Sequence, residues 1–143
     1  MKKFFLSIII TITLGVLVGK TLCSVVHAKS SKTLYLVEVG SYVNYNDAIG
    51  DTANIINKII VKNNYSYDVY IAVSFNKNNL RKITNMYKKY SYTYYIREEE
   101  IYDEKFIKNM SNFDLILMGS KKVNDIQKIN NIMLSYYDEK FVK

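Results

Sequence analysis

Residues 65–75 read YSYDVYIAVSF and contain the strongest strand signal in the chain. Aromatic and β-branched residues fill this stretch, which is typical of a strand in a sheet. Successive side chains of a strand point to opposite faces, so we expect two sets. Val69, Ile71 and Val73 form one set, and Tyr70, Ala72 and Ser74 form the other.

A second strand and a helix are predicted before this stretch. Leu34–Val39 (LYLVEV) is apolar apart from one Glu and ends at Gly40, which indicates a largely buried strand. Asn46-Asp47 is a helix-start signal. Apolar residues recur after it at helical spacing and predict a helix over about 47–62. The spaced residues are Ala48, Ile49, Ala53, Ile56 and Ile60.

The same alternation continues after residue 75. Asn78 or Asn79 is expected to cap a helix that runs to about Tyr90, and SYTYYI (91–96) predicts a third strand. The polar run REEE (97–100) is expected to close that strand. Strand, helix, strand, helix and strand within this length indicate a small α/β or α+β sheet with both helices on one face.

The last forty residues differ, because they predict two amphipathic helices over about 103–118 and 122–139. Gly119-Ser120 separates them. Apolar stripes at helical spacing are more often core than docking surface, so we expect a helical hairpin packed on the sheet. The stripe residues are Phe106, Met110, Phe113 and Leu117, then Ile126, Ile129 and Met133.

The first 28 residues are expected to direct the chain to a membrane. Phe4–Gly19 has no charge, and a transmembrane helix over 4–26 is possible if Lys20 extends toward the interface. The alternative is a signal peptide cleaved after Val26-His27-Ala28, giving a secreted protein. Both interpretations leave the remainder extracytoplasmic. Gly15 and Gly19 have the spacing that lets two membrane helices approach closely, although glycine is also common in such helices.

Composition excludes several classes of protein. Hydrophobic residues make up 49%, so the chain is not disordered. Net charge is +7, but three of the 20 basic residues (Lys2, Lys3 and Lys20) lie in the leader. The rest carries 17 against 13 acidic residues, or +4, which is a mild excess. The interleaved rings and lysines of residues 87–95 could stack on nucleic acid. The extracytoplasmic location argues against that partner.

Catalytic and metal chemistry have little support in the sequence. The only cysteine is Cys23 and the only histidine is His27, so no Cys–His or Ser–His pair can form within the domain. The acidic residues of 98–104 lack the spacing of a calcium loop. We expect a binding protein rather than an enzyme, with no cofactor and no metal.

Two motifs resemble SPOR domains. The run YLVEVGSY (35–42) looks like the opening strand of that family, with Asn46-Asp47-Ala48 where its first helix begins. The run VYIAVSF (69–75) is similar to the second signature. The resemblance covers about residues 34–98 and implies a ferredoxin-like fold with two helices behind a four-stranded sheet. Membrane-anchored members with a C-terminal extension occur in endospore-forming bacteria, whose composition this chain shares.

The resemblance also implies a ligand and a site. SPOR domains bind peptidoglycan stripped of its stem peptides, in division or sporulation. By analogy the helix-free face would bind glycan through Leu36, Glu38, Tyr70, Ala72, Tyr95 and Arg97. The expected organisation is an anchor (1–28), a linker (29–33), an α+β domain (34–100) and the hairpin (101–143). The alternative function is a protein–protein interaction module without glycan binding. A hairpin that covers the sheet, with an apolar patch exposed elsewhere, would favour that alternative.

Overall fold

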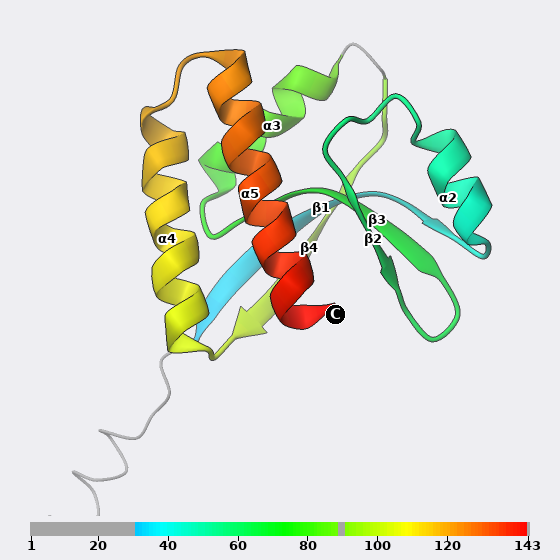
Figure 1. The fold of residues 1–143 in the computed structure, drawn as a ribbon, viewed down its shortest axis with the longest axis horizontal. Helices are drawn as coiled ribbons and strands as arrows, with labels where there is room; N and C mark the ends of the chain where they lie inside the picture. The colour runs from blue at the N-terminus through cyan, green and yellow to red at the C-terminus, as the bar shows by residue number, and fades with distance from the viewer. Residues whose placement is uncertain (1–30, 89–90, 143) are drawn as a thin grey trace, which may run out of the picture. The chain divides into compact units, whose positions relative to one another are not determined.

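The computed structural model describes residues 31–88 and 91–142, and residues 31–143 form one compact unit. The unit is α+β, with a four-stranded antiparallel sheet and helices (Figure 1). The predicted membrane helix lies outside the described residues. Among the described helices, none combines the length and apolarity that a bilayer span requires. The elements are β1 (Lys32–Tyr42), α2 (Tyr45–Asp51), β2 (Ile59–Lys62), β3 (Tyr67–Ser74), α3 (Lys77–Tyr87), β4 (Tyr95–Ile101), α4 (Glu104–Gly119) and α5 (Val123–Phe141).

The sheet has the order β2-β3-β1-β4, so β1 and β3 are central. In β1, Leu34, Leu36 and Val37 are fully buried, and in β3 burial extends from Asp68 to Ser74. Both faces of the sheet centre are therefore covered. This burial on both sides explains why the YSYDVYIAVSF stretch has no polar alternation.

α5 lies on the opposite face of the sheet from Lys77, at the start of α3. Glu98 and Glu99 are neighbours in β4, so their side chains point to opposite faces. Lys77, at the start of α3, pairs with Glu98 at 3.2 Å. Tyr137 of α5 donates a hydrogen bond to Glu99 at 2.9 Å. In Figure 1, α5 accordingly crosses in front of the strands.

The predicted helix over 47–62 is wrong in extent. α2 ends at Asp51, and residues 59–62 form β2, which pairs with β3. Asn63 closes the turn between β2 and β3 by donating its backbone N–H to the carbonyl of Ser66 at 2.8 Å. Ile59, Ile60 and Val61 are β-branched, and pairing with a buried strand stabilises them more than the end of an isolated helix would.

The third predicted strand was placed too early in the chain. β4 runs from Tyr95 to Ile101, so the charged run REEE (97–100), which was expected to close the strand, belongs to it. Ser91 has a φ of 56°, which marks the turn before the strand. Charged residues are tolerated because β4 is an edge strand, where they also hinder pairing with other chains.

The two C-terminal helices are confirmed within a few residues of their predicted ends. Asp103 caps α4, where its side chain accepts a hydrogen bond from the backbone N–H of Phe106 at 2.7 Å. Phe106 is fully buried and packs against the rings of Phe75, Tyr136 and Phe141. The hairpin and the sheet thus share one core.

α5 supplies a hydrogen-bond donor at an irregularity in the sheet. Ile71 has no partner in β1, and the pairing of β2 with β3 stops at Tyr70. The fully buried Asn130 donates its side-chain N–H to the carbonyl of Ile71 at 2.8 Å. A buried carbonyl left without a donor costs about 1–3 kcal/mol, so this bond holds α5 against β3.

Asn130→Ala should therefore destabilise the domain by about 1–2 kcal/mol, because the Ile71 carbonyl loses its donor in a dry site. Urea unfolding of residues 29–143 measures the change. Asn131→Ala, at an exposed neighbouring position, is the matched control and should change the free energy of unfolding by less than about 0.5 kcal/mol. Equal effects of the two variants would contradict this role for Asn130.

Candidate functional site

The sheet face that the resemblance assigns to glycan lies beneath the hairpin. Leu36, Glu38 and Tyr70 are at most 5% exposed. Leu36 pairs with Val73, and Phe75, two residues further along, meets Phe106 of α4. In this arrangement the three buried side chains cannot touch a ligand.

Ala72 was assigned to the wrong face. Its cross-strand partner is Val37, which is next to Leu36 and therefore points to the opposite side. The irregularity at Ile71 causes the error, because an extra residue shifts the alternation. Tyr70 still shares a face with Glu38, its partner in β1.

Tyr95 and Arg97 remain accessible at the edge of the sheet. Tyr95 is 66% exposed, and the side chain of Arg97 is half exposed. Arg97 Nε donates to the Glu38 carboxylate, and this hydrogen bond raises the pKa of Arg97. Arg97 also lies 3.7 Å from the buried Asp68. Of the six residues, Glu38, Tyr70 and Arg97 are brought together, and they form a partly buried polar cluster.

Burial keeps the hydroxyls of Tyr70 and Tyr137 protonated. Burial raises the pKa of Tyr70 to about 12, and the nearby carboxylates of Asp68 and Glu38 contribute to the shift, against Arg97. Burial also raises the pKa of Tyr137, whose hydroxyl donates to Glu99. Both hydroxyls stay protonated in the folded state well above the ordinary pKa of about 10.

We therefore expect the domain to lose stability in alkali. Below pH 10 both tyrosines are protonated in the folded and unfolded chain, so this contribution is constant. Above pH 10 only the unfolded chain releases these protons, and the free energy of unfolding falls by about 1.4 kcal/mol per pH unit for each group. Tyr70 alone would account for about 2–3 kcal/mol by pH 12.

Urea midpoints at pH 9, 10 and 11 measure this loss. Tyr137→Phe should flatten the decline above pH 10, since one group with a raised pKa is removed. Tyr65→Phe, at a position that is 91% exposed, should leave the decline unchanged. A flat profile up to pH 11 for the unaltered domain would contradict the prediction.

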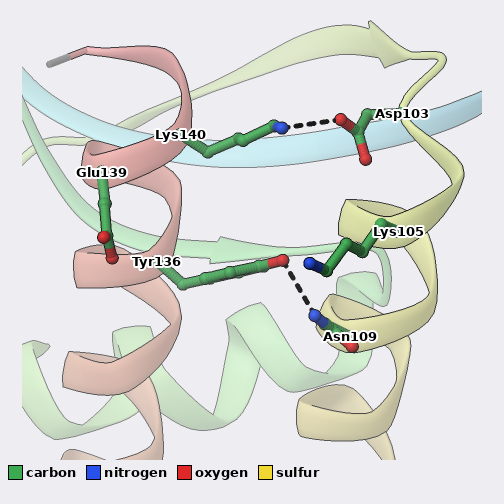
Figure 2. Close-up of a pocket in the computed structure, with 6 residues that line it drawn as sticks. All are labelled: Asp103, Lys105, Asn109, Tyr136, Glu139 and Lys140. Atoms are coloured by element: carbon green, nitrogen blue, oxygen red, sulfur yellow. Dashed lines mark hydrogen bonds and ion pairs between the residues drawn. The ribbon is translucent and has the colours of Figure 1, made fainter.

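A polar pocket of about 450 Å³ lies between the first turns of α4 and the last turns of α5 (Figure 2). Lys140 pairs with Asp103 at 2.8 Å, and Asn109 donates to the Tyr136 hydroxyl at 2.9 Å. The hydrogen bond from Lys140 lowers the pKa of Asp103. Figure 2 shows Lys105 pointing into the space between the helices. These two contacts join α4 to α5, so the residues of the pocket have a structural role.

A second groove, of about 430 Å³, lies between α4 and the connection from β3 to α3. Lys32 and Lys77 line it, together with the rings of Tyr35 and Phe75 and the side chains of Leu115 and Met118. Leu115 is 62% exposed and Met118 53% exposed. The combination of two ammonium groups and an accessible apolar wall is suited to binding an acidic, apolar surface.

The groove was not predicted from the sequence, although one signal was present. Residues 115–118 read LILM, four apolar residues in succession within an amphipathic helix. One helix face can bury only part of such a run. Leu117 is buried, whereas Leu115, Ile116 and Met118 are more than half exposed.

No group of three metal-binding side chains occurs in residues 31–88 and 91–142. The acidic residues of 98–104 are divided between β4 and the start of α4. Comparison with protein families, curated proteins and solved structures finds no match for this chain.

Proposed function

We propose that this chain is a non-enzymatic module, held at the extracytoplasmic side of a membrane, that binds protein in a membrane-associated complex. The observation that carries the proposal is the position of the hairpin. It covers Leu36, Glu38 and Tyr70, on the sheet face where the resemblance places glycan, and it leaves apolar side chains of α4 exposed. Exposed apolar side chains gathered on one helix are typical of interaction surfaces.

The arrangement of the first six elements supports a distant relation to SPOR domains. From β1 to β4 the order is strand, helix, strand, strand, helix, strand, with the sheet order β2-β3-β1-β4, as in a ferredoxin-like fold. Tyr45 of α2 packs on Tyr67, which neighbours Asp68 and so faces away from Arg97. This contact supports a position of α2 on the same side as α3, as that fold requires.

Peptidoglycan binding is a second candidate, favoured by the accessibility of Tyr95 and Arg97. Tyrosine rings can stack on sugar C–H faces, and a guanidinium can donate to hydroxyls. This exposed strip would offer a narrower site than the open sheet face of SPOR domains.

A pull-down on purified peptidoglycan sacculi separates the two functions. The full chain, solubilised in mild detergent, is incubated with intact sacculi and with amidase-stripped sacculi. We expect the unaltered chain to sediment with sacculi no more than a Tyr95→Ala/Arg97→Ala variant does. Tyr65→Ala, at another exposed tyrosine, is the matched control. Binding to stripped sacculi that this double variant loses would reject the protein-binding proposal and support the glycan site.

The protein-binding function is tested in the producing cells by chemical cross-linking of the full chain. We expect a cross-linked protein adduct that is weakened by Ile116→Ser, which changes an exposed residue of α4. Ser135→Ala, at an exposed position of α5, should leave the adduct unchanged. Absence of any protein adduct would count against the proposed function.

A further inference from the structure

The groove beside α4 is basic as well as apolar. Lys32 Nζ lies 4.5 Å from the centre of the Phe75 ring and donates to Ser111 Oγ at 2.9 Å. Lys77 Nζ lies 4.4 Å from the centre of the Tyr35 ring. Each ring thus holds an ammonium group at the groove, where it can meet a carboxylate from outside.

An acidic strip with apolar character adjoins the groove. Ile96, Glu98 and Glu100 alternate along β4 and share the face that carries Lys77. They are exposed, and β4 is the edge strand of the sheet. Glu98 pairs with Lys77 of the groove at 3.2 Å, and Glu100 accepts a hydrogen bond from Thr33 on the same face as Glu98. The basic groove and the acidic strip are therefore parts of one continuous surface.

We propose that the partner at this surface is a second copy of the chain, with the groove of each copy against the acidic strip of the other. This inference rests on the proposed protein-binding function and names its partner. In a dimer with twofold symmetry, the groove of each copy contacts the acidic strip of the other, so the same contact forms twice. Lys32 and Lys77 would meet Glu100 and Glu98 of the other copy. The exposed apolar side chains of the groove, Leu115 and Met118, would at the same time pack against Ile96 of the other copy's strip.

The groove runs along α4, on the side of the domain. β1 and α4 begin at the same end of the domain, where residue 31 continues the N-terminal segment (Figure 1). α4 then extends for 16 residues, about 24 Å, away from that end. The groove thus lies on the side of the domain.

Tethering also reduces the affinity that the surface needs. Two domains confined to one membrane have a raised effective concentration, so a modest contact suffices. The Gly15 and Gly19 pair in the expected membrane helix has the spacing that allows close approach of two helices. The sequence of the leader is thus compatible with association of two copies.

The first test is site-specific photo-cross-linking of the full chain in its membrane. A photoreactive phenylalanine replaces Leu115 at the groove, and in the control it replaces Ile132, an exposed residue of α5. We expect an adduct of twice the chain mass from position 115 only, joined to a peptide within 95–102. Adducts only with other proteins, or none, would overturn self-association. The first of these outcomes would leave the proposed protein-binding function intact.

The second test uses charge reversal in two matched variants. Lys32→Glu/Lys77→Glu and Glu98→Lys/Glu100→Lys should each reduce the adduct at least tenfold when expressed alone. Their co-expression should restore it, because opposite charges then face each other across the contact. Lys62→Glu/Lys128→Glu, at exposed lysines outside this surface, should have no effect. Loss without restoration on co-expression would overturn the proposed pairing.

Discussion

Removal of residues 103–143 should unfold the rest of the domain. The truncated chain would keep all four strands, but Leu34, Leu36 and Val73 would lose the hairpin that helps to keep them fully buried. Exposure of an aliphatic side chain of this size costs about 1.5–3 kcal/mol. Three such residues account for about 5–9 kcal/mol, which is comparable to the whole stability of a small domain.

Proteolysis and near-ultraviolet circular dichroism measure this effect on residues 29–102, with residues 29–143 as the reference. We expect rapid digestion and no near-ultraviolet signal from the truncated form. Expression of residues 103–143 as a separate chain should restore part of the protection, because the shared core can then re-form. A soluble truncated form with a cooperative urea transition would show that the sheet unit folds alone, as the domain boundary at residue 100 implies.

Asp114→Ala should destabilise the domain more than Asn130→Ala does. Asp114 is 7% exposed. It accepts hydrogen bonds from the Ser74 hydroxyl, the Phe75 backbone N–H at 2.9 Å and the Asn79 side chain at 2.9 Å. Alanine leaves these donors buried without an acceptor, at about 1–3 kcal/mol each before relaxation. We expect a total loss of about 3–5 kcal/mol.

Asp114→Asn is the matched control, because it keeps the shape and one acceptor oxygen. Its cost should be about 1–2 kcal/mol, as two of the contacts can be retained by rotation of the hydroxyl and the amide. Urea unfolding of residues 29–143 gives both values. If alanine and asparagine were equally destabilising, the loss would come from the negative charge and not from the unpaired donors.

The C-terminal hairpin is the part of the fold that local sequence patterns predicted best. Its two helices were predicted to within a few residues, because helical periodicity and the Gly119-Ser120 break are local features. The buried strand over 65–75 was recognised for the same reason. By contrast, β2 was interpreted as helix. Residues 59–62 become a strand through pairing with β3, and the local pattern does not contain that pairing.

For the predicted site, the local pattern grouped most of the residues correctly but did not predict their burial. Five of its six residues do share a sheet face, and alternation along a strand was enough to group them. Ala72 was misplaced because the irregularity at Ile71 depends on how β1 and β3 meet. The burial of Leu36, Glu38 and Tyr70 was likewise not determined by the strands themselves, because it depends on the hairpin.

The sequence by itself determined that this chain has a buried strand, amphipathic helices, a hydrophobic N-terminal segment and no Cys–His or Ser–His pair outside that segment. Each of these follows from composition or from a periodicity of a few residues. Only the tertiary structure decided that the hairpin covers the sheet, that Asp114 joins β3, α3 and α4, and that Lys32 and Lys77 line one groove with Leu115. Those outcomes depend on side chains 35 or more residues apart, and their packing energies have no local pattern in the chain.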